Sequence, residues 1–75
     1  MATPIVLPDL GAGRVTLSVW YADRGDPVLE GERLVEVLAG GATFEVVSPA
    51  TGRLKEKRVY PNEAIDVGQV LGVVE

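Results

Sequence analysis

The sequence has no cysteine and no histidine among its 75 residues. Without cysteine, the chain cannot form a disulfide, a thiolate metal site or a cysteine nucleophile. Without histidine, it lacks the commonest general base and zinc ligand, and it cannot build a Ser-His-Asp triad. We therefore predict a domain that is not an enzyme, has no catalytic residues and holds no metal.

Basic character and long apolar segments are also missing. Seven Lys and Arg against eleven Asp and Glu give a net charge of −4, and the aromatic residues are one Trp, one Phe and two Tyr. Such a chain is poorly suited to bind nucleic acid or an anionic membrane. No apolar run could span a bilayer, and the first four residues do not resemble a signal peptide. We expect a monomeric, cytoplasmic domain that binds neither nucleic acid nor membrane.

Glycine and proline are frequent, and they divide the chain into short pieces rich in Val, Leu, Ile and Thr. Such pieces are typical of strands, and no window keeps the helical period for ten or more residues. The sequence therefore predicts an all-β fold. The expected strands are Thr3–Leu7, Arg14–Tyr21, Val28–Leu29, Arg33–Leu38, Thr43–Val47, Arg53–Tyr60, Ile65–Val67 and Val70–Val74.

The chain repeats itself at a spacing of 37 residues. Neither half is large enough to bury a sheet face alone, so the halves 1–37 and 38–74 must pack together as one domain, 1–75. The repeat therefore predicts a flattened barrel or sandwich with approximate two-fold symmetry. The coinciding residues are Leu17 with Leu54, Gly31 with Gly68, Leu34 with Leu71 and Val37 with Val74, while Gly25 falls on Asn62.

One hairpin and a core can be predicted in more detail. Gly40-Gly41 lies between two apolar runs, which is typical of a two-residue hairpin loop in a type I′ turn. The alternation of Val15, Leu17 and Val19 predicts that these side chains face the interior. The full expected core is Val6, Val15, Leu17, Val19, Val28, Leu34, Val37, Val46, Leu54, Val59, Ile65, Leu71 and Val73 or Val74.

Several segments occur in an order and spacing that are specific as a set, although no single one is decisive. They are Leu7–Gly11, Trp20, Arg24–Val28, Gly31–Val37, Ala42–Val46, Ser48–Gly52 and Val67–Leu71. Together they resemble the biotinyl/lipoyl domain family, and most closely the lipoyl domains of 2-oxo acid dehydrogenase acyltransferase subunits. The resemblance implies a flattened β-barrel of two four-stranded antiparallel sheets with pseudo-two-fold symmetry, a barrel-sandwich hybrid.

One departure from the family pattern bears directly on function. Lipoyl domains have Asp-Lys-Ala at a hairpin tip, and the lysine takes the lipoyl group through an amide. The tripeptide here is Gly40-Gly41-Ala42, so the resemblance places Gly41 at the attachment position. The only lysines, Lys55 and Lys57, fall in an expected strand. Biotinyl domains need a lysine between two methionines, and the only methionine is the first residue. We therefore expect neither a lipoyl nor a biotin cofactor.

Two features are candidates for an interaction surface. Asp9, Leu10 and Gly11 resemble the loop that lipoyl domains place beside the modified hairpin, where it contributes to recognition by ligase and partner enzyme. Trp20 either packs against the core or offers an anchor to a partner. The cations of Arg53–Arg58 guard a strand edge or contact a partner.

These observations favour a lipoyl-like domain that lacks the modifiable lysine and acts as a non-catalytic scaffold or protein-interaction module. Its partners would be proteins, among them 2-oxo acid dehydrogenase components. Two alternatives stay open. The chain could be a lipoyl carrier modified at Lys55 or Lys57, or an unmodified structural module of a transport or membrane-fusion assembly.

Overall fold

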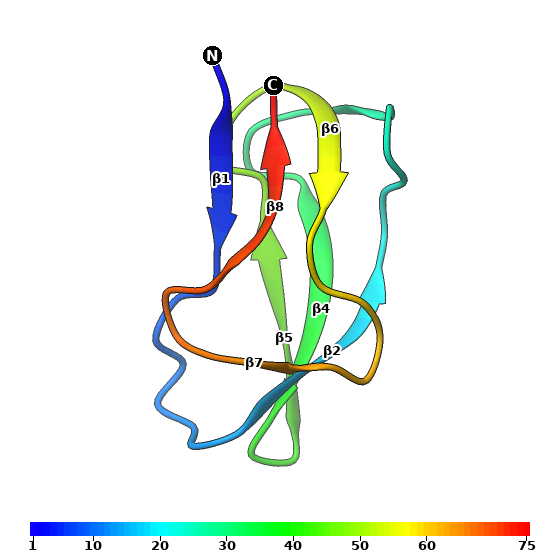
Figure 1. Cartoon of the computed structure of the whole chain (residues 1–75). Helices are drawn as coiled ribbons and strands as arrows, with labels where there is room; N and C mark the ends of the chain where they lie inside the picture. The colour runs from blue at the N-terminus through cyan, green and yellow to red at the C-terminus, as the bar shows by residue number, and fades with distance from the viewer.

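Eight strands and no helix make up the computed structural model, which describes all residues from 1 to 75. All strand pairs are antiparallel, and they form two four-stranded sheets in the orders β1-β8-β6-β3 and β5-β4-β2-β7 (Figure 1). The predicted all-β fold is confirmed. The strands are β1 (Thr3–Val6), β2 (Val15–Trp20), β3 (Pro27–Val28), β4 (Arg33–Ala39), β5 (Ala42–Val47), β6 (Gly52–Lys57), β7 (Ala64–Ile65) and β8 (Val70–Val74).

The two sheets have equivalent strand orders. Moving each strand of the first sheet four places along the chain, with β8 followed by β1, reproduces the order of the second. Hydrogen bonds repeat at the 37-residue spacing as well. The amide of Tyr21 donates to the Leu34 carbonyl at 2.8 Å, and the amide of Arg58 donates to the Leu71 carbonyl at 2.8 Å. The termini lie side by side, because Thr3 of β1 pairs with Val74 of β8.

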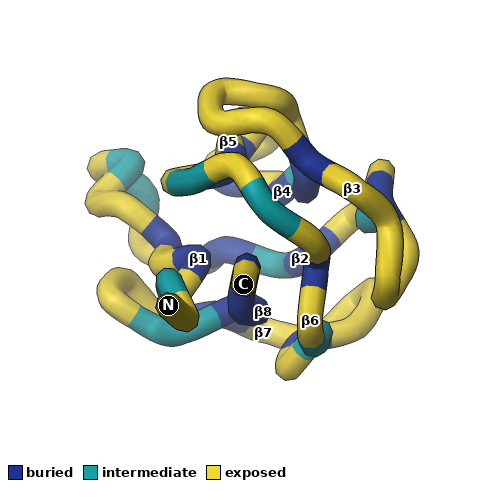
Figure 2. Tube along the Cα trace, turned by 90° about the horizontal axis from the view of Figure 1, so that it is seen from above, coloured by how far each residue is buried: buried dark blue, intermediate teal, exposed yellow.

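The core lies between the two sheets, and buried stretches occur on strands of both (Figure 2). Most of the predicted core residues are buried, including both Val73 and Val74. None of the chain's segments forms a helix with the length and apolar character needed to cross a bilayer.

The prediction that Val19 is a core residue is wrong. A register shift lies between Leu17 and Val19 where β2 pairs with β4. An extra residue in a strand reverses the side to which the following side chains point. Val19 is therefore 38% exposed, whereas Trp20 turns inward and packs against the core.

The prediction that Val6 is a core residue is also wrong, because the alternate side chains of this segment are the ones that face the core. Val6 is 41% exposed, while its neighbours Ile5 and Leu7 are buried. Alternate side chains of a strand point to opposite faces, so burying these two neighbours turns Val6 outward.

Leu34 and Leu71 are equivalent residues in the two halves, and both are 0% exposed. We expect Leu34→Ala or Leu71→Ala to lower the free energy of unfolding by about 2–5 kcal/mol, because each leaves a cavity in a closed core. Urea denaturation followed by Trp20 fluorescence measures this. Leu29→Ala is the control, since Leu29 is 65% exposed and should change stability little. Equal effects at all three positions would contradict the assigned core.

Asn62 is the one residue other than glycine with a positive φ, at 73°, and its equivalent Gly25 has φ 94°. Asn62→Ala should cost about 1 kcal/mol, because a Cβ without a polar side chain is disfavoured in this region, whereas Asn62→Gly should be nearly neutral. Thermal melts of the two variants test the difference. An alanine variant as stable as the glycine variant would show that backbone strain does not govern this turn.

Candidate functional site

The β4–β5 hairpin projects from one end of the molecule (Figure 1). It lies at the end opposite both termini (Figure 1). Ala39 pairs with Ala42, so the loop between them has two residues, Gly40 and Gly41, with φ values of 59° and 80°. Two positive φ values are what a type I′ turn requires, and glycine adopts them without strain. The two-residue loop predicted from the sequence is therefore present.

The tip of this hairpin offers only backbone atoms. A Cβ placed on Gly41 would meet nothing within 4 Å, so the position opens to solvent. A Cβ placed on Gly40 would lie 3.8 Å from the Ala12 Cβ, which is ordinary contact. Space therefore does not restrict either position, and the left-handed backbone is the constraint that favours glycine.

The loop between β1 and β2 lies beside the hairpin, as the spacing of Ala12 and Gly40 indicates. Within it, the Asp9 carboxylate accepts a 2.9 Å hydrogen bond from the Gly11 amide. Gly11 has φ 72°, and Leu10 is half-buried against the core. The three residues Asp9, Leu10 and Gly11 are thus held in one turn next to the tip, and their role in recognition stays a prediction.

Trp20 does not join this group. It ends β2 and pairs with Val35, whereas Val15 at the start of β2 pairs with Ala39 next to the tip. The Trp20 Nε1–H donates to the Val59 carbonyl at 2.8 Å, and the ring packs against the core. The contacts of Trp20 favour its packing role over a role as an exposed anchor.

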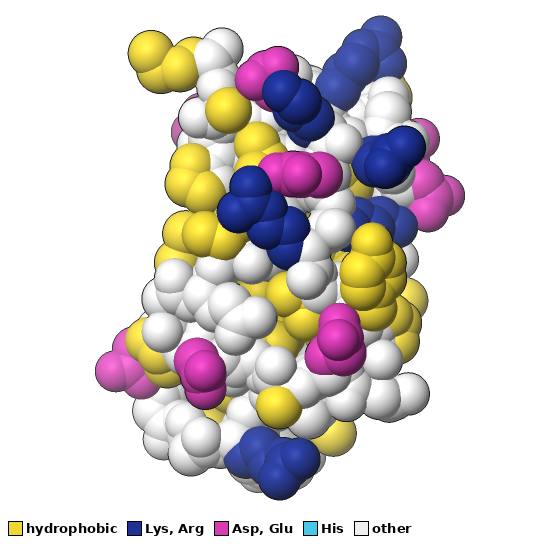
Figure 3. Space-filling view, viewed as in Figure 1, with side chains coloured by type: hydrophobic (Ala, Val, Ile, Leu, Met, Phe, Trp, Pro, Cys, Tyr) yellow, Lys and Arg dark blue, Asp and Glu magenta, His cyan; other side chains and the backbone are white.

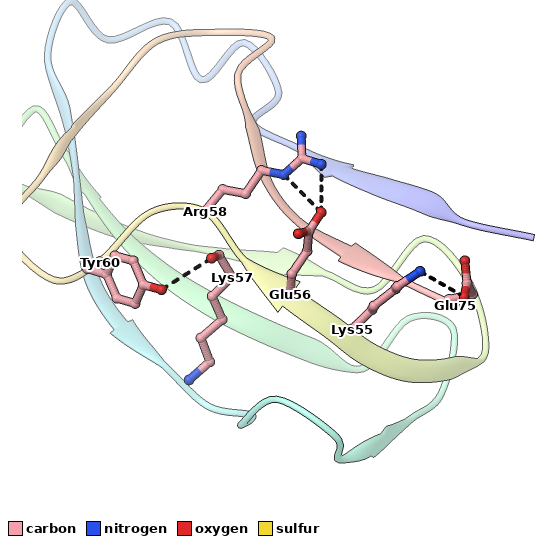
Figure 4. A network of polar contacts seen from close by, with 6 residues as sticks. All are labelled: Lys55, Glu56, Lys57, Arg58, Tyr60 and Glu75. Atoms are coloured by element: carbon pink, nitrogen blue, oxygen red, sulfur yellow. Dashed lines mark hydrogen bonds and ion pairs between the residues drawn. The ribbon is translucent and has the colours of Figure 1, made fainter.

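Both lysines lie on β6, toward the end of the molecule that carries the termini (Figure 1). Lys55 Nζ is 3.1 Å from a Glu75 carboxylate oxygen, and Lys57 Nζ is 3.1 Å from an Asp23 carboxylate oxygen. Figure 4 shows Lys55 on this strand, with its ammonium directed at Glu75, which follows the neighbouring strand β8. The Lys57 side chain is only 18% exposed, and its ammonium lies 5.5 Å from the centre of the Trp20 ring.

A pair with shifted pKa values lies on the outer face of the second sheet. The Arg33 guanidinium stacks 4.8 Å from the centre of the Tyr21 ring and contacts Glu45 at 2.9 Å. Partial desolvation, and then the charges of Glu36 and Glu45, raise the pKa of Tyr21. The hydrogen bond to Glu45 raises the pKa of Arg33. This cluster has no signal in the sequence, because its members come from three separate strands or turns.

No group of three or more acidic side chains converges in a way that could hold a metal ion. Two acidic residues of the first half, Asp26 and Glu32, instead bond to nearby backbone. The Asp26 carboxylate accepts from the Asp23 amide at 2.8 Å, and the Glu32 carboxylate accepts from the Leu29 amide at 3.2 Å. These hydrogen bonds indicate that the two carboxylates stabilise turns.

Comparison with solved structures identifies the fold class. The chain superposes on the solution structure of the lipoyl domain of the 2-oxoglutarate dehydrogenase complex from Azotobacter vinelandii with a TM-score of 0.77. The match covers 96% of this chain and 94% of that one at 22% identity. The fold is therefore that of a lipoyl domain.

Sequence comparison identifies the family. The Biotin_lipoyl family model, described as "Biotin-requiring enzyme", matches residues 3–74, so the chain belongs to this family. Members of the family normally carry lipoyl or biotin on a lysine.

Two curated relatives extend over nearly the whole chain. In an alignment of 71 positions that covers 91% of the chain, it is 37% identical to the lipoamide acyltransferase component of the branched-chain alpha-keto acid dehydrogenase complex of Pseudomonas aeruginosa. It is 35% identical over its full length to the dihydrolipoyllysine-residue succinyltransferase component of the 2-oxoglutarate dehydrogenase complex of Bartonella vinsonii subsp. berkhoffii. The chain spans 17% and 19% of the lengths of these two relatives.

The packing role of Trp20 gives a prediction. Trp20→Phe keeps an aromatic ring but removes the donor to the Val59 carbonyl, which is an expected loss of about 1 kcal/mol in the free energy of unfolding. Urea denaturation followed by circular dichroism measures it. Tyr21→Phe is the control, because the Tyr21 hydroxyl makes no comparable bond to buried backbone. Unchanged stability of the Trp20→Phe protein would contradict the packing role of Trp20 and favour its alternative role as an anchor for a partner.

Proposed function

We propose that this chain is a lipoyl-type domain without an attachment lysine, serving as a non-catalytic interaction module of a 2-oxo acid dehydrogenase acyltransferase-like protein. The observation that carries the proposal is the pair Gly40-Gly41 at the tip of the β4–β5 hairpin. The family resemblance places the attachment lysine at the second of these positions. A glycine there has no atom that could be acylated.

The cofactors of the family do not fit this tip. A lipoyl or biotinyl group needs an amine on a projecting side chain, and both tip residues are glycine. In this proposal the chain therefore takes part in no acyl-transfer step. The tip can instead contact a partner closely through its backbone amides and carbonyls, because no side chain stands in the way.

Recognition in this proposal rests on the surface beside the tip. The Asp9–Gly11 turn is held by the bond from the Gly11 amide to Asp9 and lies next to the hairpin through Ala12. A rigid loop loses little conformational entropy on binding. The proposed partners are protein components of a dehydrogenase complex, met by a monomeric domain in the cytoplasm.

The alternative in which the chain carries an acyl group on Lys55 or Lys57 has less support. Both amines are ion-paired, and both belong to β6 rather than to a projecting loop. Acylating Lys57 would also remove its contacts with Asp23 and the Trp20 ring. No observation favours the transport or membrane-fusion alternative, whereas the curated relatives are acyltransferase components.

A lysine graft tests the proposal. We expect the unaltered chain, co-expressed with a lipoyl ligase and supplied with lipoate, to keep the mass of the bare polypeptide. Gly41→Lys should introduce a substrate for the ligase, and Gly40→Asp with Gly41→Lys should be modified further, because it rebuilds the Asp-Lys-Ala tip. Intact-mass spectrometry reads the result. Each substitution should cost roughly 1 kcal/mol of stability in the left-handed backbone.

Gly25→Lys is the matched control, because it places a lysine in another exposed turn with φ 94°. It should stay unmodified. An adduct on Lys55 or Lys57 of the unaltered chain would overturn the proposal. A folded double variant that the ligase ignores would show that Gly41 is not the attachment position, or that the Asp9–Gly11 surface no longer supports recognition.

A further inference from the structure

A cationic notch lies at the end of the molecule opposite the hairpin. It is lined by Arg24, Gly25, Arg53, Leu54, Lys55 and Glu75. Three of these side chains are cations and one is a carboxylate, in a chain whose net charge is −4. Figure 3 shows Lys and Arg atoms gathered over this end of the visible face.

Backbone pairing holds the walls of the notch in place. Arg53 and Glu75 exchange two backbone hydrogen bonds of 2.9 Å, and the Gly25 amide donates to the Leu54 carbonyl at 2.7 Å. The Arg53 guanidinium donates to the Gly25 carbonyl at 3.0 Å, so its position relative to the turn is fixed. The notch is thus a feature of the folded backbone rather than a chance meeting of mobile side chains.

Two of the charges in the notch are not compensated. Lys55 is paired with Glu75, but Arg24 and Arg53 take part in none of the four ion pairs of the molecule. The other cations of this region, Lys57 and Arg58, are paired with Asp23 and Glu56. The guanidinium groups of Arg24 and Arg53, which line the same notch, are therefore free of ion pairs and can meet an external anion.

The internal repeat provides a reference for what the fold itself requires. The residues equivalent to the notch are Pro61, Asn62, Thr16, Leu17, Ser18 and Leu38, none of which is charged. The same backbone bond is present there, from the Asn62 amide to the Leu17 carbonyl at 2.8 Å. The same backbone arrangement therefore forms where none of the residues is charged. The fold does not require the cations of the notch.

Protection of a sheet edge does not explain the cations of the notch either. β6 lies inside its sheet, between β8 and β3, and Arg53 itself pairs with Pro27 of β3. Cations that guard an edge are expected on an outermost strand. The placement of Arg53 instead suits recognition of a ligand.

We propose that this notch binds an acidic, extended segment of a protein partner, with its carboxylates on the guanidinium groups of Arg24 and Arg53. Guanidinium groups bind carboxylates through two parallel hydrogen bonds, and opposite charge favours such a segment over a neutral one. The contact is exposed, so it is weak and depends on salt. It is separate from the hairpin tip and does not depend on whether the tip can be modified.

An NMR titration of the 75-residue chain with a hexaglutamate peptide tests the proposal. Amide signals of Gly25, Arg53, Leu54 and Lys55 should shift, while those of the equivalent residues Asn62, Thr16, Leu17 and Ser18 should not. Hexaglutamine should cause no shifts, and added salt should weaken binding. No shifts at millimolar peptide, or equal shifts at the equivalent residues of the other half, would overturn the proposal.

Variants that each change one charge distinguish binding at the notch from a general effect of net charge. Arg53→Gln and Arg24→Gln should each weaken hexaglutamate binding about fivefold, whereas Glu75→Gln should strengthen it by removing the competing carboxylate. Arg14→Gln is the control, because Arg14 is also outside the ion pairs and directly precedes β2. The spectrum of each variant also verifies its fold. Equal weakening by Arg14→Gln would show that only net charge matters and would contradict a site.

Discussion

The structure depends on reciprocal hydrogen bonds between the turn of each half and the strand of the other. The Gly25 amide of the first half donates to the Leu54 carbonyl of the second, and the Asn62 amide of the second donates to the Leu17 carbonyl of the first. Each strand donates in return, Leu54 to Asp26 and Leu17 to Glu63, both at 3.0 Å. Neither half can satisfy these groups alone, so the two sheets close around one core only together.

This arrangement leaves the two ends of the molecule free to differ. The buried leucines and the reciprocal turns are common to both halves, but the exposed residues at the ends are not. One end has the glycine hairpin and the Asp9–Gly11 turn, and the other has the cationic notch. A change such as a glycine at the hairpin tip alters no core contact. An intact fold is therefore compatible with a hairpin tip that has no attachment residue, as our proposal requires.

The parts that follow local rules could be predicted from the sequence. The strands, the Gly40-Gly41 loop and the positive φ of Asn62 follow from residue preferences and from the repeat. The errors at Val19 and Val6 have a different origin, since a bulge and a strand phase depend on pairing with distant residues. Only part of the cationic notch can be predicted from the sequence. The cations of β6 are evident there, but their meeting with Arg24 and Glu75 results from the closure of the barrel.

The central claim is that the domain has the lipoyl fold but carries no lipoyl or biotinyl group. The most direct measurement is the intact mass of the protein isolated from its own source, followed by peptide mapping of the hairpin and of β6. The account predicts an unmodified polypeptide at Gly40-Gly41, at Lys55 and at Lys57. A lipoyl or biotinyl adduct at either lysine, in a substantial fraction of the molecules, would contradict it.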